Sequence, residues 1–230
     1  ILWRQIRIRY KSSYEAHYVI SSEYNAHMKM HIVNRLSRYP VIESIPKSAR
    51  TSKSAAVLII LKDLEKEPSL ILTKRAANLR HHAGQVAFPG GMWESDDKSL
   101  TETALREASE EIGLSRESVE IIAMLPPASP WRRDIDVTPF VSTAVCDLDL
   151  TANPDEIEFI FDVPLKAFLD MDSYDFIEFG SDSGQSGANI KLPVLVYNKN
   201  KIWGFTLKVI TDLIEQVMDV SMAKIWSKIH

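Results

Sequence analysis

Several features that identify common protein classes are missing from this 230-residue chain. Its one cysteine, Cys146, excludes an intramolecular disulfide and a zinc site built from several cysteines, and its apolar surroundings predict a small buried side chain. No apolar run approaches the roughly 20 residues that a membrane-spanning helix needs. A net charge of −4 argues against a nucleic-acid binder that relies on bulk positive charge. These absences leave an ordinary globular protein, without a membrane or nucleic-acid partner, as a monomer or homodimer.

Charge is unevenly distributed along the chain. Residues 1–50 hold nine Lys and Arg against three Asp and Glu, so the remainder is clearly acidic. We interpret residues 1–50 as a basic, partly irregular N-terminal extension with a short helix over Ile32–Arg38, and residues 51–230 as the main domain. The basic start is typical of either a solvated arm or a targeting remnant. We therefore expect a cytoplasmic protein, with a mitochondrial or other organellar matrix as the alternative.

Apolar patterning predicts a mixed domain over residues 51–230. The first two strand-like runs flank a short polar turn, which is typical of a hairpin. Strands are predicted at Ala55–Leu61, Ser69–Arg75, Gln85–Phe88, Val119–Leu125, Asp136–Val145, Tyr174–Phe179 and Ile190–Tyr197. Helices are predicted at Leu100–Ile112, Pro164–Asp170 and Phe205–Trp226. Strands interleaved with two substantial helices indicate the α/β (α+β) class, with one mixed sheet between helices.

The most informative stretch runs from Phe88 to Leu114, FPGGMWESDDKSLTETALREASEEIGL. It joins a Pro-Gly-Gly turn and an acidic loop to the helix with the strongest signals in the chain. Ser99 followed by Glu102 fits a capping box, and Gly113 stands where a helix ends.

Three carboxylates crowd the end of this helix. Positions three and four apart share a helix face, so Glu107, Glu110 and Glu111 are expected to project together, opposite the apolar stripe. Carboxylates that close repel one another unless a cation lies between them, and hard oxygen ligands suit Mg²⁺ or Mn²⁺. Arg106 can pair with Glu110 one turn on and orient it. Arg/Glu-rich helix faces are usually just solvated, and only the surrounding motif favours a metal site here.

Residues 106–114 (REASEEIGL) resemble the second half of the Nudix box. That pattern is Gly, five residues, Glu, seven residues, then Arg-Glu-aliphatic-x-Glu-Glu-x-Gly-aliphatic. The first half departs from it, because counting back from Arg106 places Lys98 where the Glu belongs and Met92 where the Gly belongs. Counting forward from Gly91 places Asp97 at the Glu position. The loop is therefore one residue longer, and Asp97 is the expected acidic substitute.

The segment before the box is similar to the signature of the coenzyme A pyrophosphatase branch of the Nudix hydrolases. It reads Leu-Thr-Lys-Arg-Ala from Leu72, then Arg80, Gly84 and Phe-Pro-Gly-Gly from Phe88. The resemblance extends over Ala55–Trp226, about three quarters of the chain. It implies a Nudix-type α/β/α sandwich and a metal-dependent hydrolase. The expected reaction splits the pyrophosphate of coenzyme A or its thioesters into (acyl-)4′-phosphopantetheine and adenosine 3′,5′-bisphosphate.

The resemblance also implies roles for individual carboxylates. Glu107 and Glu111 would hold Mg²⁺ or Mn²⁺, and Glu110 would be a third ligand or a proton acceptor. A further Glu from a distant loop is the expected base, with Glu156 and Glu158 as candidates that are otherwise ordinary surface acids.

Two arginines are the candidates for binding the phosphates of the substrate. Arg75 and Arg80 carry guanidinium groups that match phosphate oxygens, whereas the alternative for both is a surface ion pair. Gly90 and Gly91 allow a close approach that side chains would block. Trp93 is a candidate for stacking on adenine, but packing is the safer interpretation.

Other functions remain open from sequence alone. Within the enzyme class, the substrate would instead be ADP-ribose, a dinucleotide or a nucleoside triphosphate. A non-catalytic binding module on the same fold predicts damaged metal ligands, which the intact Glu107, Glu110 and Glu111 disfavour.

Overall fold

The computed structural model describes residues 22–42, 53–130, 135–179 and 190–227. Much of the predicted N-terminal extension and the loop at 180–187 lie outside the described residues. Within the described part, no helix is long and apolar enough to cross a membrane.

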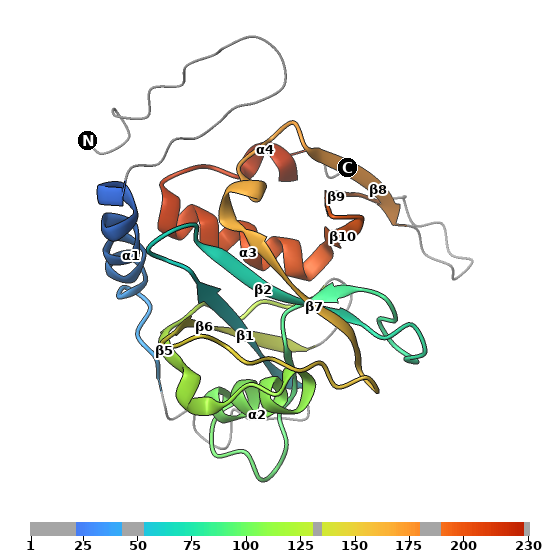
Figure 1. Cartoon of the computed structure of the whole chain (residues 1–230). Helices are drawn as coiled ribbons and strands as arrows, with labels where there is room; N and C mark the ends of the chain where they lie inside the picture. Colours follow the sequence, from blue (N-terminus) through green and yellow to red (C-terminus); the bar gives the residue numbers. More distant parts are fainter. Residues whose placement is uncertain (1–21, 43–52, 131–134, 180–189, 228–230) are drawn as a thin grey trace.

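A mixed sheet forms the centre of the molecule (Figure 1). Its strands are β1 (Ser54–Lys62), β2 (Ser69–Arg75), β3 (Val86–Ala87), β4 (Gly90–Met92), β5 (Val119–Met124), β6 (Asp136–Ala144) and β7 (Ile157–Pro164). The order is β3-β2-β1-β6-β5, with β4 paired to β1 and β7 paired to β2. β1 and β6 are parallel, and the remaining pairs are antiparallel.

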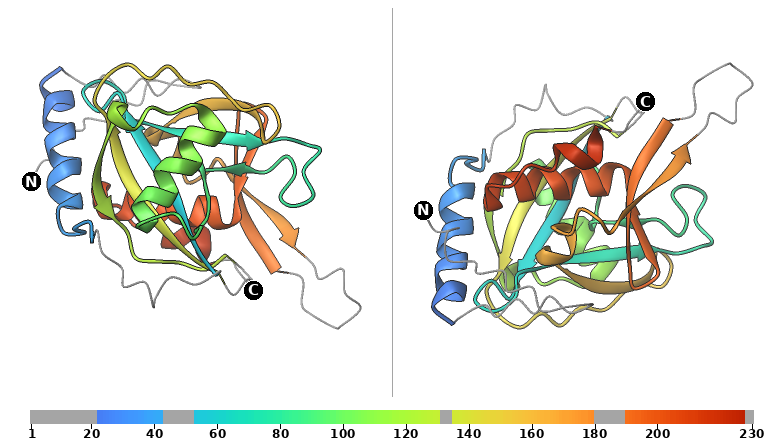
Figure 2. Two further views of the ribbon diagram at one scale, coloured as in Figure 1. Left: turned by 90° about the horizontal axis from the view of Figure 1, so that it is seen from below. Right: turned by 90° about the horizontal axis from the view of Figure 1, so that it is seen from above.

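Helices cover both faces of this sheet, as Figure 2 shows from below and from above. One face packs on α2 (Leu100–Ile112), and the other on α3 (Gly204–Met218). Alternate β1 residues divide between the two resulting cores, with Leu58 on the α2 side and Ile59 on the α3 side. The predicted class, a mixed sheet between helices, is confirmed.

Strands β1, β2, β3, β5 and β6 lie within or close to predicted runs, whereas two other strands of this sheet were missed. The predicted hairpin is confirmed, because Leu61 of β1 pairs antiparallel with Leu70 of β2. β7 was not predicted, although it pairs with β2 along most of that strand's length. β4 was also missed, because the prediction for this segment ended at Phe88, before the two glycines.

A second, three-stranded sheet lies at the C-terminal end of the chain. It has the order β10-β9-β8, from β8 (Tyr174–Phe179), β9 (Ile190–Tyr197) and β10 (Asn200–Trp203). The predicted pairing of β8 with β9 is confirmed, whereas β10 is an addition. Pro164–Asp170, predicted as a short helix, contains the 3-10 turn Leu165–Phe168.

Two other predictions need correction. The long helix predicted over Phe205–Trp226 is broken, because α3 ends at Met218 and a separate short helix, α4 (Ala223–Trp226), follows. Asp219 takes the left-handed conformation (φ 49°), in which helices commonly end. Cys146 is exposed rather than buried, because it follows the end of β6 instead of continuing that strand.

The N-terminal helix α1 (Ser22–Leu36) begins ten residues before the predicted start at Ile32 and ends before Arg38. Its Ile32 and Leu36 are fully buried in the core on the α3 side. The boundary proposed at residue 50 stays a prediction, but α1 packs as part of the main core.

Arg35 ties α1 to the end of α3. The last carbonyls of a helix have no intrahelical partner, and the Arg35 Nε donates to the Gln216 carbonyl at 3.0 Å. Its Nη2 also pairs with the Asp219 carboxylate. Arg35 therefore acts as a side-chain cap supplied by a distant part of the chain.

Arg35→Ala should lower the free energy of unfolding by about 1–2 kcal/mol, because the partly buried Gln216 carbonyl and Asp219 both lose their donor. Urea denaturation measures this change. Arg38→Ala, at an exposed position nearby, is the matched control and should change stability by under about 0.5 kcal/mol. Equal effects of the two substitutions would contradict the capping role.

Candidate active site

Glu111 is the buried member of the carboxylate cluster on α2, with 2% of its surface exposed. Its Oε1 accepts from Arg75 Nη1 at 3.0 Å, and its Oε2 accepts from the Gly90 amide at 3.1 Å. Burial raises the pKa of Glu111 to about 7, the Gly90 amide and Arg75 oppose that rise, and the negative charges of Glu107 and Glu156 add to it. This carboxylate joins the helix to both β2 and β4.

The three helix carboxylates do not share one solvated face, so that expectation is wrong for Glu111. Glu111 continues the buried stripe of Ala104 and Ala108, whereas the Glu110 side chain is 54% exposed. The spacing of Glu111 from Ala104 and Ala108 is the sequence signal that would have revealed its burial. An acidic side chain on the apolar stripe of a helix indicates either a buried hydrogen-bonding or charged partner or a functional role.

Glu107 lies against the glycine turn. A Cβ atom on Gly91 would come within 2.4–2.6 Å of the Glu107 carboxylate, so only glycine leaves this carboxylate in place. Gly90 (φ 153°) is similarly constrained, because a Cβ there would lie 2.3 Å from the Ala56 carbonyl oxygen. Burial raises the pKa of Glu107, although its neighbour Arg106 lowers it. The two glycines therefore make room for the acidic cluster.

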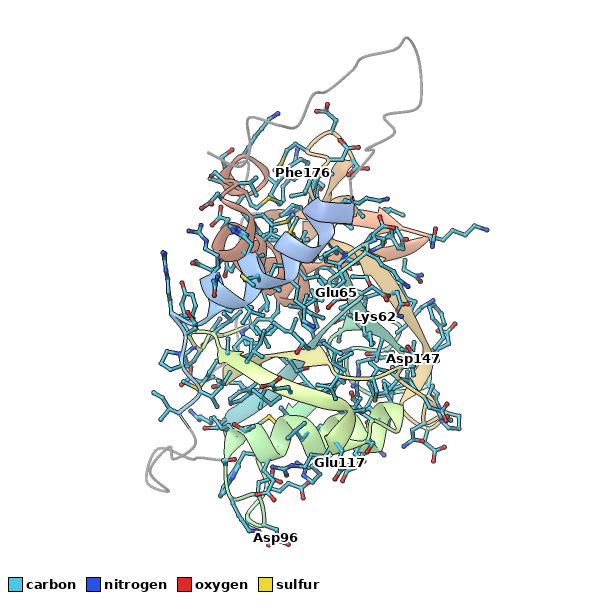
Figure 3. The ribbon with its side chains drawn as sticks, turned by 60° about the vertical axis from the view of Figure 1, so that its left-hand side comes forward. Lys62, Glu65, Asp96, Glu117, Asp147 and Phe176 are labelled. Atoms are coloured by element: carbon cyan, nitrogen blue, oxygen red, sulfur yellow. The ribbon has the colours of Figure 1, made fainter. Side chains whose placement is uncertain are left out.

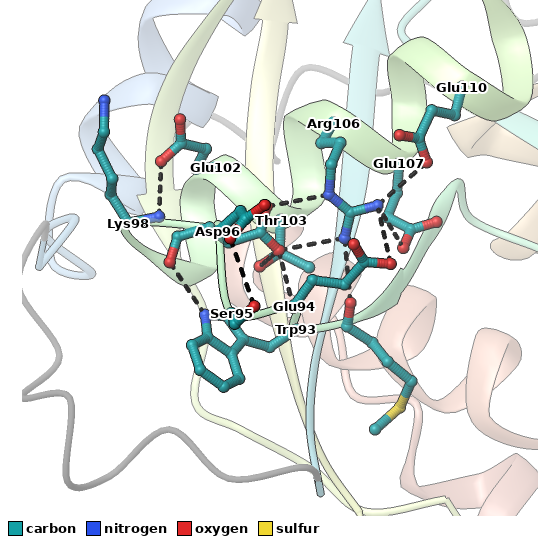
Figure 4. A network of polar contacts seen from close by, with 12 residues as sticks. Trp93, Glu94, Ser95, Asp96, Lys98, Glu102, Thr103, Arg106, Glu107 and Glu110 are labelled. Atoms are coloured by element: carbon teal, nitrogen blue, oxygen red, sulfur yellow. Dashed lines mark hydrogen bonds and ion pairs between the residues drawn. The ribbon is translucent and has the colours of Figure 1, made fainter.

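Arg106 is the centre of a polar network that includes the long loop before α2 (Figure 4). Its Nε and Nη2 donate to the two oxygens of Asp97 at 2.9 and 3.1 Å. Its Nη1 donates to both Glu107 and Glu110 at 3.0 Å, and its Nη2 also reaches the Met92 carbonyl. The predicted Arg106–Glu110 pair is present. The hydrogen bonds of this guanidinium hold the loop before α2 and two carboxylates of the helix in place.

Asp97 occupies the position expected of the acidic substitute in the longer loop. Burial would raise its pKa, but Arg106, the Glu94 amide and the Thr103 hydroxyl together lower it. The Thr103 hydroxyl donates to Asp97 at 2.8 Å. The Trp93 indole donates to the Asp97 carbonyl at 3.2 Å, which favours packing over a free stacking platform for that ring.

The structure separates the two candidates for the distant base. Glu156 is half-buried and lies near the α2 cluster, because its negative charge contributes to the raised pKa of both Glu107 and Glu111. Glu158 is exposed and pairs instead with Lys74 at 3.4 Å. Glu156 therefore joins the site, and Glu158 does not.

The two arginines predicted to bind phosphate differ in their surroundings. Arg75 is committed to Glu111, and its Nε is buried without a partner among the described residues. Arg80 is exposed on the loop between β2 and β3. In the same loop, His82 contacts the Gln85 side chain at 2.7 Å, which indicates a structural role for that histidine.

The acidic cluster has the oxygen donors that a divalent cation prefers, although its side chains are not gathered around one point. Among the described side chains, no three acidic, histidine or cysteine groups converge tightly enough to hold an ion as they are placed. The donor chemistry nevertheless suits one, because Glu107, Glu111 and Glu156 offer hard carboxylate oxygens, and the negative charge of Glu156 adds to the raised pKa of the other two. A cation among them would relieve that repulsion.

Comparison with known proteins places this site in context. Residues 52–178 match the model of the NUDIX domain family. The chain is 37% identical over 172 residues to "Uncharacterized Nudix hydrolase NudL" of Photorhabdus laumondii, covering 75% of this chain and 89% of that protein. A protein of the same name from Cronobacter sakazakii is also 37% identical, covering 79% and 92% of the two chains.

Similarity to solved structures is lower. An Ap4A hydrolase from C. elegans has a TM-score of 0.41 and 18% identity, covering 49% of this chain and 80% of that one. A MutT/nudix family protein from Enterococcus faecalis has a TM-score of 0.43 and 15% identity, covering 88% and 76%.

Asp97→Asn should lower the free energy of unfolding by about 2 kcal/mol, because Arg106 keeps its charge while losing its bidentate partner. Urea denaturation measures the loss. Asp96→Asn is the matched control, since Asp96 lies at the exposed tip of the same loop (Figure 3). A control as unstable as the Asp97 variant would contradict the anchoring role.

Glu111→Gln should stabilise the metal-free protein at pH 8. A carboxyl group with a folded pKa near 7 and an ordinary value of 4.5 binds its proton more tightly in the folded state. Stability therefore falls as pH rises from about 4.5 to 7, by roughly 3 kcal/mol at about 1.4 kcal/mol per pKa unit. Thermal unfolding in chelator at pH 4.5 and 8 measures this, and an unchanged pH dependence in the variant would contradict it.

Proposed function

This chain belongs to the Nudix family and is a pyrophosphohydrolase, and from that premise we propose that it hydrolyses coenzyme A or its thioesters. The bond broken is the pyrophosphate linkage. The products are 4′-phosphopantetheine, or its acyl form, and adenosine 3′,5′-bisphosphate. A cytoplasmic location and a monomeric or homodimeric state stay predictions.

The observation that carries this proposal is the position of the motif that resembles the coenzyme A branch. Its first half ends in β2 at Arg75, which contacts Glu111. Its second half is the turn at Gly90, whose amide contacts the same carboxylate. The exposed Arg80 lies on the loop between these two parts. The residues that suggest the substrate are therefore continuous with the acidic site.

The chemistry explains why such a site needs both signs of charge. A diphosphate carries negative charge that repels an incoming water, so catalysis depends on charge neutralisation and alignment. Nudix hydrolases as a class use divalent metal ions, and Mg²⁺ or Mn²⁺ bound here would neutralise the diphosphate and lower the pKa of a bound water. Glu107 and Glu111 would hold the ion, with Glu110 as a third ligand or proton acceptor at the exposed edge.

The chain's own residues supply orientation and proton transfer. Glu156 lies near the cluster and is the candidate to accept a proton from the attacking water. Arg106 holds Glu107 and Glu110 in fixed positions through one nitrogen atom. Arg75 holds Glu111, and a substrate phosphate would compete with Glu111 for that guanidinium.

Coenzyme A carries a 3′-phosphate in addition to its pyrophosphate, which gives a specific reason for an additional exposed cation. The guanidinium of Arg80 is accessible and matches phosphate oxygens in its geometry. ADP-ribose and NADH lack that 3′-phosphate and would gain nothing from such a contact.

Side-by-side hydrolysis of coenzyme A, ADP-ribose and NADH tests the substrate. With Mg²⁺ or Mn²⁺ we expect coenzyme A to have the highest kcat/KM, and chelator to abolish turnover. Coenzyme A turnover no better than that of the other two would refute the substrate. Glu111→Gln should remove most activity on every substrate while the protein stays folded, because it removes a charge needed to hold the ion.

Arg80→Ala should raise the KM for coenzyme A by on the order of 10-fold with little change in kcat, because a hydrogen bond to a charged group is lost. The loss should be smaller on dephospho-coenzyme A, which lacks the 3′-phosphate. Steady-state kinetics measure both effects, with Arg116→Ala, exposed beyond the end of α2, as the matched control. An unchanged KM for coenzyme A would show that Arg80 has no phosphate role.

A further inference from the structure

A short segment of chain, residues 151–157, crosses the C-terminal end of α2, and we call it the strap. The Thr151 amide donates to the Ile112 carbonyl at 3.0 Å, and the Asn153 amide donates to the Glu111 carbonyl at 2.9 Å. These carbonyls belong to the last turn of the helix, where intrahelical donors are lacking. Gly113 takes the left-handed conformation (φ 66°) that ends the helix, and a Cβ there would make only an ordinary contact with Thr151, 3.4 Å from its carbonyl oxygen. The strap is therefore attached to the helix at the residue that bears the buried carboxylate.

Asn153 folds the strap into a tight turn. Its Oδ1 accepts from the Asp155 amide at 3.2 Å, and its carbonyl accepts from the amides of Glu156 at 3.0 Å and Ile157 at 2.8 Å. Pro154 follows it, and proline presets the φ angle that the second position of such turns requires. Asparagine favours this site because its side chain can close the turn onto the backbone two residues on.

The far end of the turn is attached to β2. The Glu156 carbonyl accepts from the Ala76 amide at 2.8 Å, one residue beyond Arg75. The backbone of Glu156 is thus held between the end of α2 on one side and the end of β2 on the other. The Glu156 carboxylate is close enough to Glu107 and Glu111 for its negative charge to add to the raised pKa of both.

We propose that Asn153 is a positioning residue, whose turn holds the Glu156 carboxylate where it can act together with Glu107 and Glu111 on one bound cation and its water. The proposal rests on the function proposed above in that it needs a metal-dependent hydrolase with Glu156 in its site. It does not depend on coenzyme A being the substrate. Asn153 itself touches neither substrate nor ion in this arrangement.

Kinetics test the proposal first. Asn153→Ala should lower kcat by on the order of 10-fold with little change in KM, because a displacement of about 1 Å in a catalytic group is enough to cost rate. Asn153→Asp keeps an oxygen that accepts the Asp155 amide and should restore most of kcat. Asp155→Ala is the matched control, since that turn bond uses only the backbone of Asp155. Wild-type kcat in Asn153→Ala, or an equal loss in Asp155→Ala, would overturn the assignment.

A double-mutant cycle separates a positioning role from a merely structural one. If Asn153 acts through Glu156, Asn153→Ala should cost little further kcat in the Glu156→Gln background. An undiminished further loss would overturn the proposal. Pro154→Gly loosens the turn without removing any side-chain hydrogen bond, and it should change kcat in the same direction as Asn153→Ala.

Binding of Mn²⁺ without substrate gives a readout besides activity. Isothermal titration should show an affinity for Mn²⁺ reduced by about 10-fold in Asn153→Ala, recovered in Asn153→Asp and unchanged in Asp155→Ala. Equal affinities in all three variants would contradict the positioning role. Kinetic assays use whichever diphosphate the unmodified enzyme hydrolyses fastest, so a wrong substrate changes the assay and leaves the ratios between variants intact.

Discussion

Burial of one carboxylate at the junction of helix and sheet is the constraint on which the rest of the structure depends. Glu111 lies on the apolar stripe of α2, where a charge is costly unless it is paired. The sheet supplies two donors, the Gly90 amide and Arg75, which come from different strands. Because both donors meet the same side chain, the helix, the glycine turn and the end of β2 must keep one relative position. These two donors lower the pKa of Glu111 by less than burial raises it, so the ionised carboxylate is still unfavourable in the folded protein. A divalent cation bound nearby would stabilise that negative charge.

Arg106 neutralises the carboxylates on the more exposed side of the same helix. Bidentate pairing with Asp97 fixes the guanidinium, and its remaining nitrogen, Nη1, donates to both Glu107 and Glu110 and so bridges the two carboxylates. Asp97 in turn fixes the longer loop, because it also accepts from the Glu94 amide and the Thr103 hydroxyl. An aspartate is shorter than the glutamate of the usual pattern, and a loop with one more residue can bring it closer. The two departures from the Nudix pattern therefore compensate for each other.

Local signals made part of this arrangement predictable. The bounds of α2 follow from its caps, since the Ser99 hydroxyl accepts from the Glu102 amide and Gly113 takes the left-handed conformation. The bounds of α1 were not predictable in this way, because it is held by tertiary contacts such as that of Arg35 with the end of α3. The acidic character of the site was visible in sequence, whereas the burial of Glu111 depends on which face of the helix meets the sheet. The periodic pattern of a single sequence predicts that Glu111 is buried only if an acidic residue is accepted as a member of the apolar stripe.

The choice between Glu156 and Glu158 shows most clearly what sequence spacing cannot supply. Residues two apart on a regular strand point to the same face, but only Glu158 lies in β7, and Glu156 lies in the turn just before that strand. The pairing of β2 with β7 is irregular at this point, because Lys74 pairs with Phe159 while Arg75 pairs with Ile157. Glu158 is the extra residue of this bulge, which bends the strand and redirects side chains. Glu158 pairs with Lys74 at this bulge, whereas the turn before β7 holds Glu156 near the acidic cluster, so the backbone around the start of β7 determines which carboxylate is available for chemistry.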